Sequence, residues 1–285
     1  MIIRKAERKQ AKIRLALQGP SGSGKTYSAI LIASGLVDDY TNICIIDTEN
    51  GSADLYAHLG DYKVIPLPKP HTPERYIQAI ELAEKEGAKC IIIDGLSHCW
   101  EYLLDYHAGL TGNSFTNWSK ITPRINDLVA KILSSTSHII ATIRVKQDYV
   151  LQDKGNGKLT PEKVGLKTIM RDGIDYEFTI VLELDISHFA KSSKDRTELF
   201  TDLPSFKITS KTGSEILQWC LSGVSTDKVK SLIENAADIK ELTEIYKSYT
   251  AYYPILEAEF IAKKTLLTTS ILSPNNNLQN GITNH

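Results

Sequence analysis

The fold of this chain is decided by the stretch Gly19-Pro20-Ser21-Gly22-Ser23-Gly24-Lys25-Thr26. This stretch satisfies every constrained position of the phosphate-binding pattern G-x-x-x-x-G-K-[ST]. Residues 13–17 before it alternate and are β-prone enough for a buried strand, and residues 27–37 after it place apolar side chains at helical spacing. A loop between a strand and a helix is the setting in which this pattern forms a P-loop, and a chance glycine-rich turn lacks that setting. The sequence therefore predicts a site for a nucleoside triphosphate.

The residues of this loop have distinct expected roles. Glycines let the backbone turn so that its N–H groups point at a polyphosphate, and the N-terminus of the following helix adds positive potential. We expect Lys25 to reach the β- and γ-phosphates of ATP and the Thr26 hydroxyl to bind Mg²⁺. The predicted nucleotide-binding residues of the loop are Gly19, Pro20, Ser21, Gly22, Ser23, Gly24, Lys25 and Thr26.

Three further predicted strands end in charged residues. Continuous apolar runs end at Asp47, at Asp94 and at Arg144. The run from Cys90 to Asp94 has the pattern of a Walker B strand, whose aspartate holds Mg²⁺ through water. Because strands and helices alternate along the chain, we predict an α/β fold with a doubly wound, mainly parallel sheet. Ligands bind at the carboxyl ends of the strands in such sheets, which places these charged residues near the P-loop.

The composition is that of an ordinary globular protein, with 42% hydrophobic and 24% charged residues among 285. The formal net charge is −1, so any nucleic-acid site must be a local basic patch. The 4 cysteines form no C-x-x-C pair, which favours small core residues in a reducing compartment. No apolar run reaches the roughly 18 residues that a membrane helix needs, and no signal-peptide core follows the basic N-terminus. We expect a cytoplasmic protein.

The segment from Gln147 to Met170 interrupts the alternation of strands and helices. We predict a long loop without secondary structure of its own. Two interpretations stay open, because long loops are commonly functional but a solvated surface hairpin has the same composition. The basic residues in or beside this segment are Lys146, Lys154, Lys158, Lys163, Lys167 and Arg171.

The character of the sequence changes again beyond Trp219. Three short amphipathic helices are predicted at 227–235, 239–248 and 255–264, and an Asn-rich tail follows them. We therefore predict a P-loop domain, a small C-terminal helical appendage and a disordered tail, which occupy residues 1–220, 221–272 and 273–285.

The order of these motifs resembles the ATPase core of RecA and its relatives. The resemblance covers roughly residues 10–210 and is carried by the P-loop, Ile46-Asp47-Thr48-Glu49, Asp54-Leu55-Tyr56-Ala57 and the Walker B strand. The chain resembles still more closely the short RecA-like ATPases of bacteriophages, the Sak-type proteins, some of which act in single-strand annealing and recombination. Neither the predicted loop nor the C-terminal helices are similar to RecA in sequence, so strand exchange on duplex DNA is not implied.

The resemblance implies roles for five residues outside the P-loop. Glu49 matches the RecA-family glutamate that orients the attacking water, and Tyr56 matches the position whose ring packs on adenine. Arg144 stands where the family has a polar residue that senses the γ-phosphate, and the loop after it matches the mobile loop that contacts DNA. Lys194 and Arg196 resemble the Lys-x-Arg pair of hexameric helicases, which enters the ATP site of a neighbouring subunit.

Other interpretations of these residues remain open. Glu49 also fits a solvated loop carboxylate, and Asp47 is its rival for catalysis; the position just past a strand favours Glu49 and a supporting role for Asp47. The turn expected at Lys191–Arg196 equally fits an ordinary charged hairpin tip. We expect His98 and His138 to be packing residues, because no triad or metal-ligand spacing surrounds them.

The motifs together predict an oligomeric ATPase, of phage or mobile-element origin, that uses ATP and Mg²⁺ and acts on single-stranded DNA in recombination or annealing. A homo-oligomeric ring or filament is expected, with a single-strand-binding or replication protein as a further partner. The first alternative is a nucleotide-gated adaptor that recruits a replication partner through its C-terminal helices. The second is a P-loop small-molecule kinase, which is disfavoured because the sequence shows no Arg-rich lid.

Overall fold

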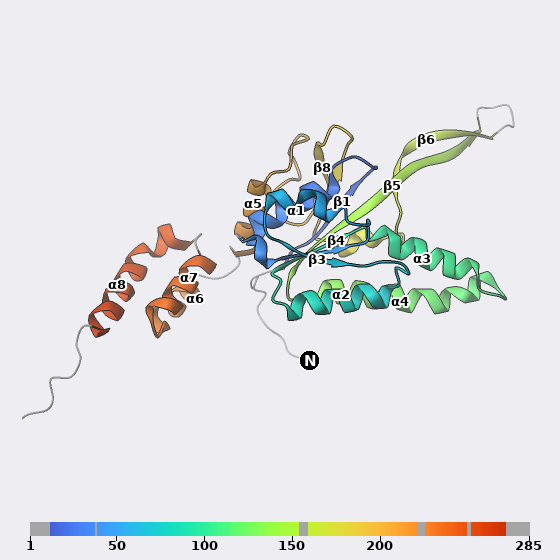
Figure 1. Ribbon diagram of the computed structural model, residues 1–285. Coiled ribbons are helices and arrows are strands. Elements are labelled where there is room, and N and C mark those ends of the chain that lie inside the picture. The colour runs from blue at the N-terminus through green and yellow to red at the C-terminus, as the bar shows by residue number, and fades with distance from the viewer. Residues whose placement is uncertain (1–11, 38, 154–158, 222–225, 250–251, 272–285) are drawn as a thin grey trace, which may run out of the picture. The chain divides into compact units, whose positions relative to one another are not determined.

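The computed structural model describes residues 12–37, 39–153, 159–221, 226–249 and 252–271 (Figure 1). The chain divides into two compact units, one formed by Lys12–Leu217 and the other including Gln218–His285. The P-loop and the other residues predicted to bind or hydrolyse the nucleotide all lie in the first unit.

A mainly parallel β-sheet forms the centre of the first unit. Its strand order is β3-β2-β4-β5-β1-β7-β8, and β6 pairs with β5 outside this order. Strand β1 runs parallel to β5 and β7 on its two sides, whereas β8 at the edge is antiparallel to β7. The predicted α/β fold with a mainly parallel, doubly wound sheet is confirmed. The strands are β1 (Arg14–Gly19), β2 (Ile43–Asp47), β3 (Lys63–Pro66), β4 (Cys90–Asp94), β5 (His138–Asp153), β6 (Leu159–Thr168), β7 (Ile180–Leu184) and β8 (Ala190–Asp195).

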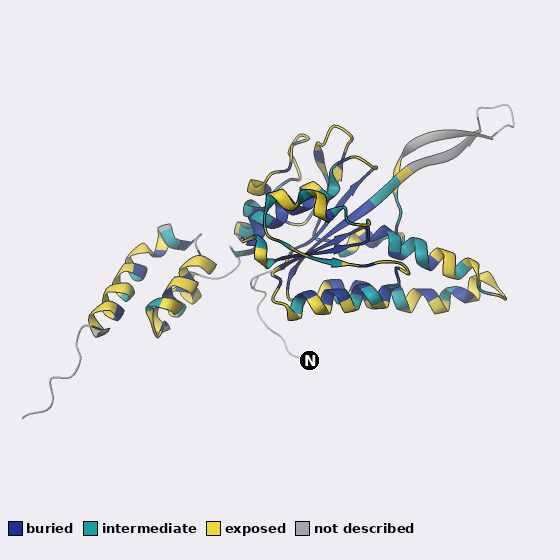
Figure 2. Cartoon of the chain, viewed as in Figure 1, coloured by how far each residue is buried: buried dark blue, intermediate teal, exposed yellow. Residues whose placement is uncertain are grey.

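Helices cover both faces of this sheet, which is why its central strands are apolar without alternation. Figure 1 shows α2, α3 and α4 on one face and α1 and α5 on the other. Every residue of β2 and β4 is buried, and Figure 2 shows the buried centre of the sheet between exposed outer helix faces. The helices are α1 (Lys25–Val37), α2 (Pro73–Lys85), α3 (Ser97–Ala108), α4 (Ser114–Ser134) and α5 (Ser210–Leu221), with short 3₁₀ turns η1 (Tyr40–Asn42), η2 (Ala53–Leu59) and η3 (Ile174–Glu177).

The helix that follows the P-loop, α1, packs closely against α5 through a contact between two glycines. A Cβ atom at Gly35 of α1 would lie 1.9 Å from the carbonyl oxygen of Ser210, and one at Gly213 of α5 would lie 2.0 Å from that of Ile32. Neither position accepts a side chain unless the helices move apart. The two backbones therefore touch, and this contact fixes α1 against α5.

Of the two interpretations left open for the segment from Gln147 to Met170, the structure shows the hairpin, so the expectation of a loop without secondary structure was wrong. Strand β5 continues past the sheet to Asp153 and pairs antiparallel with β6, from Val145 opposite Thr168 to Asp153 opposite Leu159. We call the part of β5 from Val145 to Asp153, together with β6, the hairpin arm, and Figure 1 shows these two strands projecting away from the rest of the sheet. Two residues expected to contact DNA, Lys154 and Lys158, lie outside the described residues.

The turn expected at Lys191–Arg196 is also placed differently in the structure. Residues 190–195 form β8, and the turn that joins it to β7 lies earlier, where the Asp185 carboxylate accepts from the backbone N–H groups of Ser187 and Phe189. The prediction was wrong because β8 is an edge strand of mainly polar composition, with side chains that are mostly exposed or half-buried. Such a composition is also typical of a turn.

His138, the first residue of β5, is a packing histidine as expected. Its ring is 4% exposed, and its Nδ1 accepts from the backbone N–H of Ile13 at 3.2 Å. Burial lowers the pKa of His138 to about 3, and the nearby charges of Lys12 and Arg14 act in the same direction. The neutral ring thus links the start of β5 to the residue before β1, at the edge of the sheet opposite the nucleotide motifs.

The second unit is helical and has its own core. Its helices are α6 (Thr226–Asn235), α7 (Ile239–Ser248) and α8 (Tyr253–Ile271). Buried residues from all three, including Val229, Leu242 and Phe260, form one hydrophobic cluster. The predicted tail lies outside the described residues. Among the helices that the structure describes, none is long and apolar enough to cross a membrane.

Candidate nucleotide site

The P-loop runs from the end of β1 to the start of α1, and its backbone requires the glycines of the pattern. The φ angle is +79° at Gly22 and +81° at Gly24, values that only glycine adopts at low cost. Gly19 is required for a different reason, because a Cβ there would lie 2.5 Å from the Ser23 hydroxyl and 2.7 Å from the Leu184 carbonyl oxygen. The loop is therefore a tight turn whose shape depends on its sequence.

The P-loop carries groups that fit a phosphate chain. The ammonium of Lys25 folds back over the loop and donates to the carbonyl oxygens of Gly19 at 2.9 Å and Pro20 at 2.8 Å. Burial lowers the pKa of Lys25, and the carboxylates across the cavity oppose this shift. The Ser23 hydroxyl is buried and has no hydrogen-bond partner among the described residues. A cation and an unsatisfied buried hydroxyl are groups that phosphate oxygens would stabilise.

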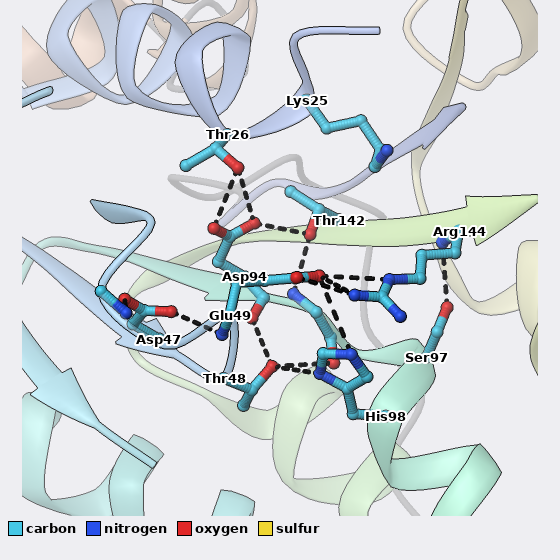
Figure 3. Close-up of polar contacts among 12 residues, drawn as sticks. Lys25, Thr26, Asp47, Thr48, Glu49, Asp94, Ser97, His98, Thr142 and Arg144 are labelled. Carbon is cyan, nitrogen blue, oxygen red and sulfur yellow. Dashed lines mark hydrogen bonds and ion pairs between the residues drawn. The ribbon is translucent and has the colours of Figure 1, made fainter. Parts of the chain in front are cut away.

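Asp94, at the end of β4, is the most buried charged group of the site at 1% exposure. Its carboxylate accepts from the Thr26 hydroxyl at 2.9 Å and from the Thr142 hydroxyl at 2.8 Å (Figure 3). The Thr142 hydroxyl donates in the second bond, because an ionised carboxylate can only accept, and the Thr142 oxygen in turn accepts from the backbone N–H of Gly95 at 2.8 Å. Burial raises the pKa of Asp94 to about 6, although the two hydroxyl donors act in the opposite direction.

The pair formed by Thr26 and Asp94 fits the predicted Mg²⁺ site. A hydroxyl and a carboxylate are hard oxygen ligands of the kind that Mg²⁺ takes in nucleotide sites, where substrate phosphates and water complete the shell. Within the described residues, no group of three or more His, Cys, Asp and Glu side chains that could hold a metal comes together. A metal here would therefore depend on phosphate oxygens as well as on the protein.

Asp47, the rival of Glu49 for catalysis, is engaged with the backbone. Its carboxylate accepts from the N–H groups of Glu49 at 2.6 Å, Gly51 at 2.9 Å and Ala53 at 3.4 Å. These bonds fold the loop after β2 into a turn and leave little of the carboxylate free. Asp47 therefore positions Glu49.

Glu49 and Arg144 form an ion pair that joins the loop after β2 to β5, at the point where β5 leaves the main sheet (Figure 3). The guanidinium donates from Nη2 to both carboxylate oxygens, at 2.8 and 2.7 Å, and from Nε to Oε1 at 3.2 Å. The backbone N–H of Arg144 donates to the Ser97 hydroxyl at 2.9 Å, which fixes the start of its side chain. The side chains are 28% and 38% exposed, so the pair is accessible from solvent and can exchange partners.

These groups surround one cavity of about 480 Å³, a volume typical of a small-molecule site. Tyr56, on η2, lines it, and its ring centroid lies 5.6 Å from that of Tyr27, the residue after the P-loop. Most of the predicted nucleotide residues thus line one cavity with two carboxylates and a guanidinium, whereas Gly19, Pro20 and Ser23 are not part of its lining. The lining includes Ser21, Gly22, Gly24, Lys25, Thr26, Glu49, Asp94, Thr142 and Arg144.

Lys194 and Arg196 are not part of this cavity. They lie at the end of β8, where Asp195 pairs with Ile180, the first residue of β7. Because β7 is parallel to β1, this is the amino edge of the sheet, opposite the P-loop. Lys194 Nζ donates to the carbonyl oxygens of Asp175 at 2.7 Å and Tyr176 at 2.8 Å, and Arg196 Nη2 donates to that of Tyr176 at 3.1 Å.

Two residues that sequence reasoning missed belong to the site. Thr142 stands two positions before Arg144 on β5, so the period of a strand places both side chains on one face. That signal was available in the sequence. His98, expected to be a packing residue, lies 3.9 Å from the Glu49 carboxylate, measured from Nε2 to Oε1. No spacing in the sequence indicates this contact, because it depends on the turn between β4 and α3.

We predict that Thr142→Val raises the Mg²⁺ concentration needed for half-maximal ATP turnover by about tenfold. Valine has the shape of threonine without the hydroxyl, and a hydrogen bond to a charged group contributes about 1.5–3 kcal/mol. Asp94 then loses the donor that holds it beside Thr26. Thr142→Ser keeps the hydroxyl and is the matched control. Identical Mg²⁺ titrations for the valine, serine and unmodified proteins would show that Thr142 does not position Asp94.

The comparisons with known proteins agree with this geometry. Residues 11–214 match a family model described as an AAA domain. A search of curated proteins gave no match. The matched range contains every residue that lines the nucleotide cavity, together with the hairpin arm, and it covers more than half of the chain. The chain therefore belongs to the AAA domain family, the class of P-loop, nucleotide-binding ATPase domains.

Proposed function

We propose that this protein hydrolyses ATP with Mg²⁺, using Glu49 to orient and deprotonate the attacking water. One observation carries the proposal. The Glu49 carboxylate is held by Arg144 at the border of the cavity that contains Lys25, Thr26 and Asp94. Phosphoryl transfer to water needs charge that neutralises the phosphates, a metal and a group that orients the water. This cavity brings together residues for all three.

The P-loop and its neighbours would bind the substrate. The loop N–H groups and Lys25 would take the β- and γ-phosphates, and the Tyr56 ring would pack on the adenine. Thr26 and Asp94 would hold Mg²⁺, which when bound neutralises charge on the β- and γ-phosphate oxygens. These residues would orient the γ-phosphate toward the Glu49–Arg144 pair.

Arg144 would couple substrate arrival to the release of Glu49. A guanidinium binds phosphate and carboxylate by the same bidentate geometry, so a γ-phosphate at the cavity competes with Glu49 for Arg144. When Arg144 turns toward the phosphate, a carboxylate oxygen of Glu49 becomes free to accept a proton from water. The ion pair thus keeps Glu49 oriented until substrate is present.

We predict that Glu49→Gln leaves ATP binding within a few-fold of the unmodified protein and slows turnover by about 10²-fold or more. Glutamine keeps the shape of the side chain and loses the group that accepts the proton. Binding is measured with a fluorescent ATP analogue and turnover by phosphate release. Lys25→Ala, which removes phosphate-neutralising charge, is the positive control for lost turnover. If Glu49→Gln hydrolysed ATP at the unmodified rate, Glu49 would have no role in the chemistry.

We also propose that the protein acts on single-stranded DNA, in phage or mobile-element recombination or annealing, and that the hairpin arm contacts the phosphate backbone. Lys146 and Lys167 stand directly opposite each other on β5 and β6, and both are exposed. Like charges in this arrangement repel, and a phosphate between them would relieve the repulsion. Lys167 has a surface ion pair with Asp172, at 3.2 Å, which contributes little in water.

We predict that replacing Lys146 and Lys167 together by glutamine lessens the salt dependence of single-stranded DNA binding. Each lost phosphate contact lowers the slope of log K against log salt by about 0.7. The double variant removes a repulsive pair, so it should unfold at the same temperature as the unmodified protein or higher. Lys85→Gln, on exposed α2, is the matched control. An unchanged slope in the double variant, or no binding by the unmodified protein at low salt, would remove DNA from this proposal.

The protein is proposed to work as a head-to-tail ring or filament, in which Lys194 and Arg196 approach the cavity of a neighbouring subunit. Their position at the amino edge of the sheet supports a contact between subunits, because that edge faces away from the P-loop of the same chain. A contact between the amino edge of one subunit and the carboxyl edge of the next is heterologous, which generates rings or filaments. A guanidinium from outside contributes about 10³–10⁵ in rate in other nucleotidases.

We predict that Arg196→Ala and Lys25→Ala subunits are each nearly inactive alone and regain partial activity when mixed. In the mixture some junctions pair an intact P-loop with an intact Arg196. The measurement is phosphate release at constant total protein after subunit exchange, with light scattering to record the assembly. Full activity of Arg196→Ala alone, or no recovery in mixtures shown to exchange, would exclude this role.

The adaptor alternative keeps one structural observation in its favour, the separate hydrophobic core of α6, α7 and α8. A unit with its own core can bind a replication partner independently of ATP hydrolysis. The same assays distinguish the two functions. The adaptor function would be favoured if the protein bound ATP tightly but hydrolysed it more slowly than it released the nucleotide. The rate of hydrolysis would then also be unaffected by single-stranded DNA.

A further inference from the structure

His98 has a place in the site that its expected packing role does not explain. It lies in the first turn of α3, and its side chain is 13% exposed. Its ring stacks on His71, with the centroids 5.0 Å apart and the planes 19° apart. Gly95 makes room for this placement, because its φ is +98° and a Cβ there would lie 2.2 Å from the Thr48 hydroxyl and 3.0 Å from His98 Nδ1. The turn after β4 therefore seats His98 against Thr48.

The hydrogen bonds of Thr48 determine which nitrogen of His98 carries the proton. The Thr48 oxygen lies 2.7 Å from the carbonyl oxygen of Asp94, which can only accept, so the single hydroxyl proton is donated there. Thr48 also lies 2.8 Å from His98 Nδ1, and its oxygen must accept from that nitrogen. The neutral ring is therefore protonated at Nδ1. The lone pair of the ring is then on Nε2, which lies 3.9 Å from the Glu49 carboxylate.

Burial is the main reason that the ring of His98 is neutral, and the surrounding charges partly oppose one another. Burial lowers the pKa of His98 most, and Arg144, on β5, lowers it further, whereas Glu49, after β2, raises it. His71, in the loop before α2, also lowers the pKa, and Glu101, on α3 itself, raises it. The result is a pKa below the ordinary 6.5, so at neutral pH the lone pair of Nε2 is available.

His98 also lines a second cavity, of about 690 Å³. This cavity shares Glu49 and Arg144 with the nucleotide cavity, so the ion pair stands between the two. The P-loop does not contribute to the second cavity, whose other lining includes Lys69, His71 and Glu101. A proton that reaches His98 thus faces a solvent space different from the one that holds the phosphates.

We propose that His98 is the proton acceptor behind Glu49, and that the second cavity is the exit for the proton that ATP hydrolysis releases. This inference rests on the proposed ATPase function. The water oxygen forms a bond to the γ-phosphorus as the bond between that phosphorus and the bridging oxygen breaks, with its electron pair going to ADP. The water proton passes to Glu49 and from Glu49 to His98 Nε2. His98 then releases a proton to bulk water through the second cavity, and Glu49 is ionised for the next turnover.

His98 acts through Glu49, so its loss should lower kcat and leave ATP binding unchanged. We expect His98→Asn to reduce kcat by about 10²-fold, with the dissociation constant of ATP within twofold. The asparagine amide can still donate to Thr48, as Nδ1 does, but has no base at the position of Nε2. In the unmodified protein kcat should fall as the pH drops through the pKa of His98, and His98→Asn should lose this part of the pH dependence while keeping the part that Asp94, with a pKa of about 6, contributes. His107→Asn, on the same helix, is the matched control.

Chemical rescue gives a readout that a structural role would not produce. His98→Ala opens the ring position toward the second cavity, where added imidazole can replace the lost base. We expect imidazole to restore turnover of His98→Ala in a saturable manner, and to have no effect on Glu49→Gln, in which the relay lacks its first acceptor. His98→Gln, with an amide near the position of Nε2, should be as slow as His98→Asn and give the same information if either variant fails to fold.

The outcomes separate this inference from the ATPase proposal. Normal kcat and an unchanged pH profile in folded His98→Asn or His98→Gln would overturn the role of His98. Loss of turnover in folded His98→Ala without any effect of imidazole would also overturn it, and would assign His98 a purely structural role. If Glu49→Gln is slow while the His98 variants are normal, the ATPase proposal stands alone. If Glu49→Gln is itself normal, both fail.

Discussion

The site depends on burying the carboxylate of Asp94 in the middle of the sheet edge. A buried charge is costly unless donors surround it, and here the donors come from different parts of the chain. Thr26 belongs to α1, and Thr142 belongs to β5. The backbone carbonyl oxygen of Asp94 accepts from the hydroxyl of Thr48, the residue that follows β2. One helix, one strand and the residue after a second strand therefore each contribute a hydrogen bond to Asp94. These bonds fix the relative positions of the groups that border the nucleotide cavity.

The Glu49–Arg144 pair is a different kind of interaction. Both side chains are partly exposed, so the pair contributes little to the free energy of folding. Its place between two cavities matters more. Asp47 and Ser97 hold the backbones of the two partners, which leaves the ends of the side chains free to change partners while their starting points stay fixed. Because the ion pair is weak in water, it can open and re-form in each turnover. Because the backbones of both partners are held, Glu49 and Arg144 return to the same positions.

The sequence was sufficient for the parts of the site that are local. The P-loop is defined by adjacent residues, and the order of strands places Asp94, Glu49 and Arg144 at one edge. The contact between Glu49 and Arg144 was not predictable, because it depends on the directions of two side chains 95 residues apart. The hairpin arm could be named only as one of two alternatives, because its strands lie outside the main order of the sheet and carry polar residues, so no core face imposes an alternating pattern. The edge strand β8 was mistaken for a turn because its residues are also mainly polar.

The hairpin arm and the site share one strand, and this limits where the chain can change in length. Adding one residue to each strand at the tip would lengthen the arm and leave every pairing before Val145 in register. Adding one residue between His138 and Thr142 would turn Thr142 and Arg144 to the opposite face of the sheet, since side chains alternate along a strand. The hydroxyl would leave Asp94 and the guanidinium would leave Glu49 together. Related chains are therefore free to differ in the reach of the arm, while the part of β5 inside the sheet must keep its length.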